Sequence, residues 1–168
     1  KDLGRIVELY QKWATQKPTA KAVVVYATMW HSTEKMARAI SESLAEEGVK
    51  VKMMPVNEVH RSNVVYEVLE AGALIVGSST LNNNILPAMA DVMTYLKGLK
   101  PANLIGASFG SYGWSGESVR HLEEMLKEMK VEIAAESVSS KQVPDEAVLA
   151  KCRELGKTIA ARLLTSGT

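Results

Sequence analysis

Short runs of consecutive apolar residues alternate along this chain with longer stretches in which apolar residues recur every three or four positions. Three runs, 21–26, 72–77 and 104–109, are apolar on successive residues, as in strands buried on both faces of a sheet. Two further runs, 49–53 and 131–135, alternate apolar with charged residues and are typical of edge strands. This alternation of strands and helices predicts a parallel sheet built from βαβ units.

The stretches between the apolar runs have the spacing of helices. Helices are predicted around four apolar stripes, over residues 36–44, 86–97, 122–129 and 148–163. Cys152, the single cysteine, lies on the last stripe and is predicted to be a buried apolar residue rather than a redox thiol. One cysteine excludes an internal disulfide, and the chain has no Cys-x-x-Cys pair for zinc or an iron–sulfur cluster.

Three interior strands and two edge strands fit one doubly wound order. With the strands numbered along the chain, the order 2-1-3-4-5 puts the second and fifth strands at the edges. This is the flavodoxin-like α/β fold, a five-stranded parallel sheet with helices on both faces. Its ligand site lies beyond the carboxyl ends of strands 1 and 3, which points to the loops 28–33, 78–84 and 110–116.

Length and charge limit the classes of protein that this chain can represent. Its 168 residues fit one domain over residues 20–168, preceded by a short amphipathic helix over residues 1–17; we expect residues 1–19 to be a linker. The net charge of +1 argues against a nucleic-acid surface. The apolar runs are far shorter than the roughly 20 residues that span a bilayer, and no signal peptide opens the chain. We therefore expect a cytoplasmic protein with no membrane partner.

The first loop, in the segment TMWHSTEKMA, has the composition of a phosphate site. Thr28, Ser32 and Thr33 offer hydroxyl groups where a helix begins, and a helix start favours an anion. The alternative is that Ser32 or Thr33 serves only as the helix N-cap. The chain has neither Gly-x-Gly-x-x-Gly nor a Walker lysine, so a dinucleotide or nucleoside triphosphate has little support. We expect His31 to point into water.

The second and third loops suggest a flat ligand. Asn82 or Asn83 can make a tight turn that presents backbone groups, although asparagines are also ordinary turn formers. Tyr112 and Trp114 lie in a glycine-rich loop, and Trp30 adds a third ring from the first loop. A flat aromatic ligand would stack on these rings; the alternative is an aromatic cluster or a protein–protein patch.

These three loops carry a resemblance to a known family. The segments YATMWHSTEKMA, STLNNNILP and IGASFGSYGWSGE closely resemble the flavodoxin-like domain of A-type flavoproteins, also called flavodiiron proteins, and the resemblance covers residues 20–165. It implies FMN as cofactor. The phosphate contacts that it implies come from Thr28, Met29, Trp30, Ser32 and Thr33. It places the isoalloxazine ring between Thr80, Leu81, Asn82 and Asn83 on one side and Ser111, Tyr112, Gly113, Trp114 and Gly116 on the other.

The same resemblance implies partners. Members of this family carry an amino-terminal metallo-β-lactamase-like domain whose diiron centre, held by His, Asp and Glu, reduces oxygen or nitric oxide. This chain has three histidines and no His-x-Glu-x-Asp pattern, so we expect an excised carboxyl-terminal module with no catalytic residue or metal site of its own. Its FMN would pass electrons to the diiron centre of the same parent chain or of the other subunit of a head-to-tail dimer. The electrons would come from rubredoxin, a reductase or another carrier.

The residues give less support to three other functions. A self-contained flavodoxin-like NAD(P)H:quinone reductase would need a nicotinamide pocket, which no segment suggests. A hydrolase is suggested by Gly-x-Ser-x-Gly over residues 106–110, but Ser108 falls within a predicted strand and His121 precedes Asp145, contrary to the order Ser, Asp, His. A phospho-receiver domain would need acidic residues after the first strand, where the sequence has Tyr-Ala-Thr.

Overall fold

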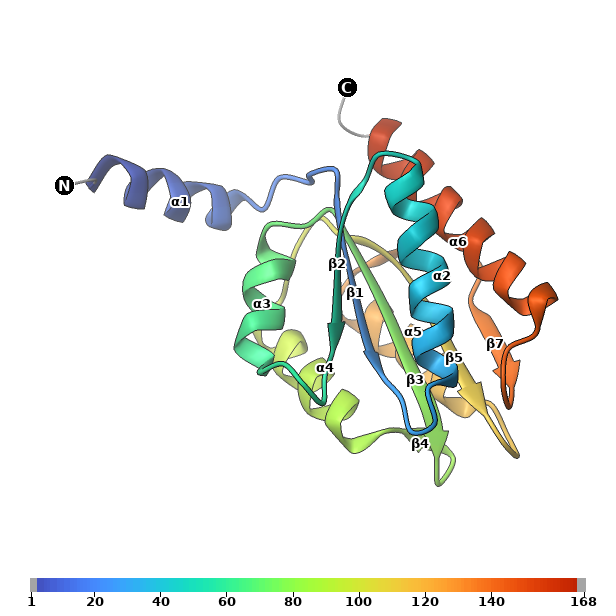
Figure 1. Cartoon of the computed structure of the whole chain (residues 1–168). Coiled ribbons are helices and arrows are strands. Elements are labelled where there is room, and N and C mark those ends of the chain that lie inside the picture. The colour runs from blue at the N-terminus through green and yellow to red at the C-terminus, as the bar shows by residue number, and fades with distance from the viewer. Residues whose placement is uncertain (1–2, 166–168) are drawn as a thin grey trace.

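A parallel sheet with the strand order β2-β1-β3-β5-β6 forms the centre of the computed structural model, which describes residues 3–165 (Figure 1). Along this path lie β2 (Lys50–Pro55), β1 (Lys21–Ala27), β3 (Ala73–Leu81), β5 (Ile105–Tyr112) and β6 (Glu132–Ile133). Two short strands lie off the path: β4 (Asn84–Ile85) pairs antiparallel with β3, and β7 (Val138–Lys141) pairs parallel with β5. The flavodoxin-like order 2-1-3-4-5 is confirmed, with β6 and β7 sharing the fifth position.

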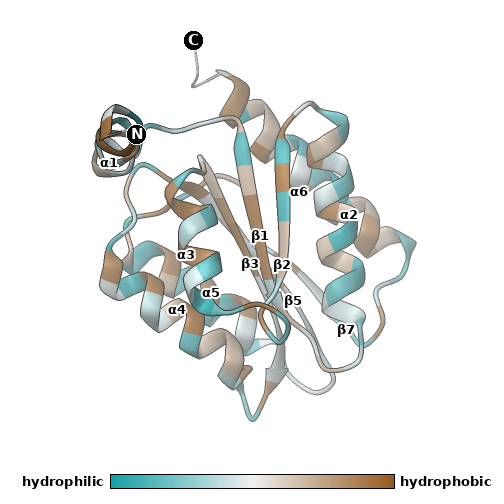
Figure 2. Ribbon diagram, turned by 60° about the vertical axis from the view of Figure 1, so that its left-hand side comes forward, coloured by the Kyte–Doolittle hydropathy of each residue, from teal (hydrophilic) through white to brown (hydrophobic). Residues whose placement is uncertain are grey.

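Helices cover both faces of this sheet. They are α1 (Leu3–Thr15), α2 (Ser32–Glu46), α3 (Arg61–Leu69), α4 (Pro87–Leu99), α5 (Glu117–Glu128) and α6 (Glu146–Thr165). α2 and α6 pack on one face of the sheet, and α3, α4 and α5 pack on the other. Figure 2 shows hydrophobic residues along the central strands between these two helix layers. Because both faces are covered, the interior strands must be apolar on successive residues, as their sequences are.

One helix and one strand differ from the sequence prediction. Helix α3 was not predicted; it has only nine residues and buries only Val64 and Val68, so its apolar stripe is short. The predicted strand 131–135 is wrong in extent. The chain pairs with β5 only at 132–133, leaves the ladder, and pairs again from Val138, opposite Phe109. Between these two pairings the edge segment contains two residues more than β5 does, so the ladder is interrupted as in a β-bulge.

Helix α1 extends away from the sheet at the amino edge of the strands (Figure 1). Trp13 meets Tyr66 edge-on with ring centroids 6.2 Å apart, and Asn103 Nδ2 donates a hydrogen bond of 3.1 Å to the Gln16 carbonyl. The apolar residues Leu3 and Ile6 remain exposed. The amphipathic helix is therefore present, and the role of residues 1–19 as a linker stays a prediction.

Cys152 lies fully buried between α6, α2 and the sheet. Burial raises the pKa of this thiol to about 12, so it is protonated at neutral pH. The prediction of a buried apolar residue is confirmed. Over residues 3–165, no helix has both the length and the apolar composition needed to cross a membrane.

The contact between α2 and α6 depends on a glycine. A Cβ added at Gly156 would lie 2.8 Å from the Ile40 carbonyl oxygen, a distance that real Cβ atoms do not reach. The absence of a side chain therefore lets α6 approach α2 and set the position of α2 above the sheet.

We expect Gly156→Ala to lower the free energy of unfolding by about 1–3 kcal/mol, because the added methyl forces the two helices apart. Gly98→Ala in α4 is the matched control, since a Cβ there meets nothing within 4 Å. This control should raise stability by up to about 1 kcal/mol through helix propensity. Urea unfolding of both variants checks the prediction, and a shift of the same sign in both would contradict it.

Candidate functional site

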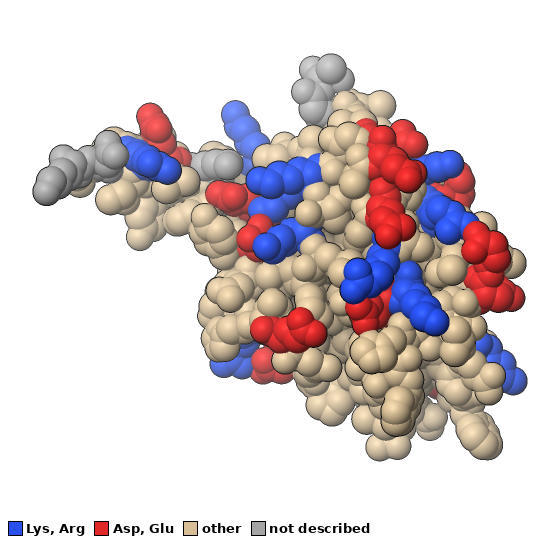
Figure 3. All heavy atoms as spheres, in the orientation of Figure 1, with Lys and Arg blue, Asp and Glu red and all other residues tan. Residues whose placement is uncertain are grey.

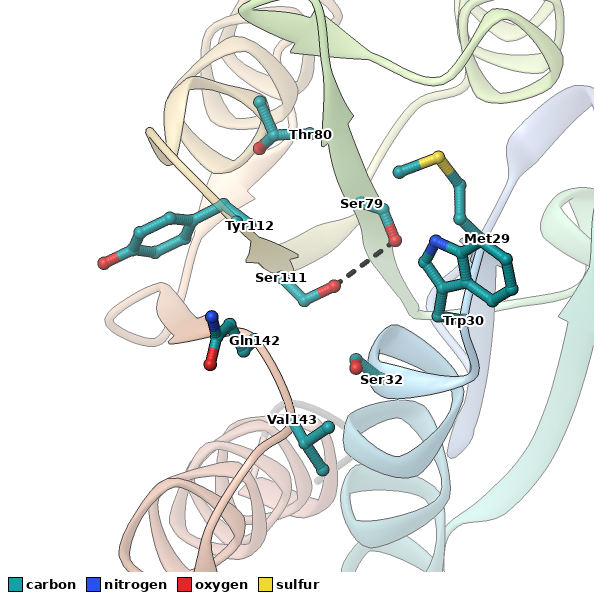
Figure 4. A pocket seen from close by; sticks show the side chains of 10 residues that line it. Met29, Trp30, Ser32, Ser79, Thr80, Ser111, Tyr112, Gln142 and Val143 are labelled. Atoms are coloured by element: carbon teal, nitrogen blue, oxygen red, sulfur yellow. Dashed lines mark hydrogen bonds between the residues drawn. The ribbon is translucent and has the colours of Figure 1, made fainter.

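A cavity of about 220 Å³ opens at the carboxyl edge of the sheet. Residues from four segments line it: the β1–α2 loop and the start of α2, the ends of β3 and β5, and the β7–α6 loop. They are Met29, Trp30, Ser32, Ser79, Thr80, Ser111, Tyr112, Gly113, Gln142 and Val143. Figure 4 shows their side chains around the space. The cavity thus lies where a doubly wound sheet reverses its winding direction, which is where such folds bind ligands.

Three buried hydroxyl groups form a ring at the base of this cavity. Thr33 Oγ1 lies 3.0 Å from Ser79 Oγ and 2.9 Å from Ser111 Oγ, and the two serine oxygens are 3.3 Å apart. Three hydroxyls carry three hydrogens, so each contact in the ring can be a hydrogen bond. The ring joins the first turn of α2 to the ends of β3 and β5 and holds them at fixed distances.

The start of α2 has no side-chain cap. The N-cap residue is His31, in the left-handed region with φ of 60°, and neither its side chain nor another caps the helix. The alternative in which Ser32 or Thr33 is the N-cap is therefore wrong, because both already lie within the helix. The backbone N–H groups of the first turn stay available to an anion.

His31 is directed toward a carboxylate and water. Its side chain is 77% exposed, and Nδ1 lies 2.7 Å from Glu34 Oε2. The hydrogen bond with His31, followed by that with Arg38, holds the pKa of Glu34 below its usual value. Glu34 therefore stays ionised and paired with Arg38 at neutral pH, which limits its repulsion of an anion at the start of α2.

Thr28 has a buried side-chain oxygen without a protein partner. Among the described residues, nothing forms a hydrogen bond with Thr28 Oγ1. Buried hydroxyl groups are nearly always hydrogen-bonded, so a ligand is a candidate partner for this one. The loop that carries Thr28 lies directly before α2. None of the described residues that line the cavity is Lys, Arg, Asp or Glu, and Figure 3 shows few charges over this end of the molecule. Hydroxyls and backbone N–H groups are thus the donors for a bound anion.

Two rings border the cavity from opposite sides. Figure 4 shows Trp30 and Tyr112 on opposite sides of the space, with the Tyr112 ring directed away from Trp30. Trp30 is 83% exposed, and Trp114 is 98% exposed and does not line the cavity. In the part of the chain that the structure describes, Trp30, Tyr112 and Trp114 make no ring–ring contact, so the alternative aromatic cluster is not formed. The rings of Trp30 and Tyr112 therefore remain available to a flat ligand.

The second loop makes the predicted tight turn. Asn82 and Asn83 have φ of 48° and 59°, and the turn joins β3 to β4 with Leu81 opposite Asn84. Two successive left-handed residues are the pattern of a type I′ hairpin. Ser115 Oγ donates a hydrogen bond of 3.3 Å to Asn83 Oδ1, which links this turn to the third loop.

The cavity brings together half of the residues that the resemblance assigned. These are Met29, Trp30, Ser32, Thr80, Ser111, Tyr112 and Gly113. Thr33 lies behind them in the hydroxyl ring. The residues placed outside the cavity wall are Thr28, Leu81, Asn82, Asn83, Trp114 and Gly116. The predicted contacts of all these residues with FMN remain predictions.

Three residues of the wall were not predicted. Ser79 precedes Thr80 at the end of a buried strand, and its position beside a predicted site residue was a usable signal. Gln142 and Val143 had no such signal, because they reach the cavity through the interrupted pairing at the edge of the sheet.

The geometry removes the hydrolase hypothesis. Ser108 lies inside β5 and is 1% exposed, so no substrate can reach its hydroxyl. His121 Nδ1 lies 3.1 Å from Asn84 Oδ1 and is not directed at Ser108. Within residues 3–165, no group of three or more His, Cys, Asp or Glu side chains is placed to hold a metal ion.

Comparison with protein families and solved structures gives one consistent relationship. The family model described as flavodoxin matches residues 24–156. The nitric oxide reductase of Moorella thermoacetica is 46% identical over 164 residues, which is 97% of this chain and 41% of that protein. The chain spans about 40% of the length of the curated relatives that it matches.

Two solved structures share the fold. The rubredoxin oxygen:oxidoreductase from the anaerobe Desulfovibrio gigas superposes with a TM-score of 0.94 and 46% identity, covering 96% of this chain and 40% of that one. A flavodoxin from the domain Archaea superposes with a TM-score of 0.75 and 34% identity, covering 86% of this chain and 99% of that one. This chain is therefore homologous to the flavodoxin-like part of flavodiiron proteins.

A pair of threonine variants tests the two kinds of hydroxyl at this site. Thr33→Val removes the hydroxyl shared by Ser79 and Ser111 and should lower the free energy of unfolding by about 1–3 kcal/mol. Thr28→Val removes a hydroxyl without a partner and should leave the stability of the ligand-free protein unchanged or slightly raised. Urea unfolding measures both, and equal losses in the two variants would contradict the assignment.

Proposed function

Because this chain belongs to the flavodoxin family, we propose that it is an FMN-binding electron-transfer domain that delivers electrons to a diiron oxygen or nitric oxide reductase centre on another domain. The observation that carries this proposal is the uncharged cavity at the carboxyl ends of β1, β3 and β5, bordered by Trp30 and Tyr112. It offers a place for a flat ring beside an uncapped helix start.

Membership of the flavodoxin family implies FMN as the cofactor, and the site fits it. When bound, FMN supplies an isoalloxazine ring that accepts and releases electrons. The first-loop residues bind the phosphate, and the donors are the Thr28 and Ser32 hydroxyls and the first N–H groups of α2, that of Thr33 included. The unpartnered Thr28 hydroxyl supports this role. Met29 and Trp30 complete this part of the site.

The second and third loops bind the ring of FMN. On one side we place Thr80, Leu81, Asn82 and Asn83, and on the other Ser111, Tyr112, Gly113, Trp114 and Gly116. Their rings and apolar atoms exclude water from one part of the flavin, and their backbone dipoles act on its nitrogen atoms, which sets the reduction potentials. The exposed Trp30 and Trp114 stand at the surface, where a second protein can approach.

The lining of the cavity supports electron transfer rather than acid–base catalysis. Among the described residues that line it, the Tyr112 phenol is the only titratable side chain. Proton abstraction near neutral pH is most often carried out by His, Asp, Glu or Lys, and none of these is among the described residues that line the cavity. Electron transfer needs no such group, because the cofactor carries the electrons.

The proposed partner is a diiron metallo-β-lactamase-like domain. The relatives that suggest it are named a nitric oxide reductase and a rubredoxin oxygen:oxidoreductase, and this chain matches about 40% of each. Helix α1 leaves the sheet at the edge opposite the cavity (Figure 1). A domain joined through α1 would therefore lie far from the cavity, which favours the metal domain of the other subunit in a head-to-tail dimer. Rubredoxin, a reductase or another carrier would be the electron donor, in a cytoplasmic setting.

FMN binding is tested first. Added FMN should lose fluorescence on binding, and Trp30→Ala should weaken its affinity about threefold to tenfold because one stacked ring is lost. Trp114→Ala should weaken it less, since that ring stands outside the cavity wall. Trp13→Ala, on α1, is the control and should leave affinity unchanged. A wild-type chain that neither quenches nor retains FMN would overturn the proposal, and equal affinities for the Trp30 and Trp13 variants would remove the stacking argument.

Electron transfer is tested with separate domains. The FMN-loaded chain is reduced without oxygen and mixed with nitric oxide and with the separately purified part of the Moorella thermoacetica nitric oxide reductase that this chain does not match, which we propose to be the metal domain. We expect the metal domain to accelerate the reoxidation of the flavin. The rate is measured from the return of visible flavin absorption. Reoxidation at the rate seen without the metal domain, together with rapid oxidation of NAD(P)H by a quinone, would favour a self-contained reductase instead.

A further inference from the structure

The loop between β7 and α6 supplies a wall of the cavity that neither the residue patterns nor the resemblance assigned. Gln142 and Val143 both line the cavity. Figure 4 shows Gln142 beside Tyr112 and Ser111, and it shows Val143 on the side toward Ser32. This loop therefore borders the space between the start of α2 and the end of β5.

The interrupted edge of the sheet brings the loop to this place. Because the edge segment contains two extra residues before β7, pairing with β5 resumes at Val138, and Lys141 lies opposite Tyr112, the last residue of β5. The backbone N–H of Gln142 then donates a hydrogen bond of 2.7 Å to the Tyr112 carbonyl. Buried Pro144 anchors the chain just after it. The backbone at Gln142 is thus held by contacts on both sides.

Gln142 adopts a backbone conformation that residues other than glycine rarely adopt. Its φ is 60°, in the left-handed region. In an extended strand, successive side chains point to opposite faces, and a left-handed residue breaks this alternation. Gln142 and Val143 can therefore face the same cavity. Backbone strain of this kind persists where surrounding contacts hold it, and it clusters at ligand sites.

The amide of Gln142 is free to bind a ligand. It has no hydrogen-bond partner among residues 3–165, whereas three hydroxyl groups of the wall, those of Ser79, Thr80 and Ser111, already have partners. Ser79 and Ser111 share theirs with Thr33, and Thr80 donates to Ser118 at 2.7 Å. Gln142 offers two N–H donors and one acceptor at the cavity.

We propose that Gln142 is a cofactor-binding residue, whose side-chain amide donates a hydrogen bond to the ribityl phosphate chain of FMN. This inference rests on the proposed function. The ribityl phosphate chain is chosen over the ring because Val143, the next residue, lies toward Ser32 at the start of α2, where the phosphate is assigned. Gln142 itself lies beside Ser111 and Tyr112, which are assigned to the ring, so it stands between the ring and the phosphate, where the ribityl chain joins them.

Two variants separate the amide from the strain. Gln142→Ala and Gln142→Gly both lose the amide, and each should weaken FMN binding about fivefold to tenfold. Glycine adopts φ of 60° freely, so Gln142→Gly should be at least as stable as Gln142→Ala. Lys130→Ala is the control, because Lys130 is another exposed left-handed residue, with φ of 62°, away from the cavity. Affinity comes from titrated flavin fluorescence and stability from urea unfolding of the ligand-free protein.

The visible absorption spectrum of FMN at saturation gives an independent readout. It should match the wild-type complex in both Gln142 variants, because contacts to the ring are unchanged. The inference is overturned if both variants bind FMN within about twofold of the wild type, or if affinity is lost only in the less stable one. An altered flavin spectrum would also overturn it, since the residue would then act on the ring. A wild-type chain that does not bind FMN would refute the proposed function itself.

Discussion

Parallel pairing of β1, β3 and β5 in matched register is the constraint on which the site depends. Ala27 pairs with Ser78, and Ser79 pairs with Ser111, so the three strands end side by side. The loops that follow must then leave the sheet at one edge. The Thr33 hydroxyl closes the arrangement by bonding to both Ser79 and Ser111, which ties α2 to the two central strands.

The site contains hydroxyl groups and an amide, but it is uncharged and largely apolar. Its wall consists of hydroxyls, an amide, rings and the apolar side chains of Met29 and Val143, and none of the described residues that line it is Lys, Arg, Asp or Glu. A phosphate can be held there by hydroxyls and the free N–H groups of a helix start, as in other helix-terminal anion sites. This site requires strained backbone conformations, because four residues near this edge have positive φ: His31, Asn82, Asn83 and Gln142.

Much of the fold and part of the site could be predicted from residue patterns. The apolar runs marked three interior strands because both faces of those strands are buried, and the strand order followed. The tight turn at Asn82 and Asn83 was also predictable, because asparagine tolerates left-handed backbone. The N-cap alternative was wrong because helix α2 begins at Ser32, so that both Ser32 and Thr33 lie within its first turn. Helix α3 was missed because nine residues give too short an apolar stripe.

The sequence by itself determined the class of sheet, the burial of Cys152 and the three loops at which a ligand would bind. These follow from local patterns of apolar and turn-forming residues, which act within a few positions of one another. Only the tertiary structure decided that Thr33 bonds to Ser79 and Ser111, that Trp114 stands outside the cavity, and that Gln142 enters it. These depend on strand register and on the two-residue interruption before β7, and register is set by pairing between distant segments.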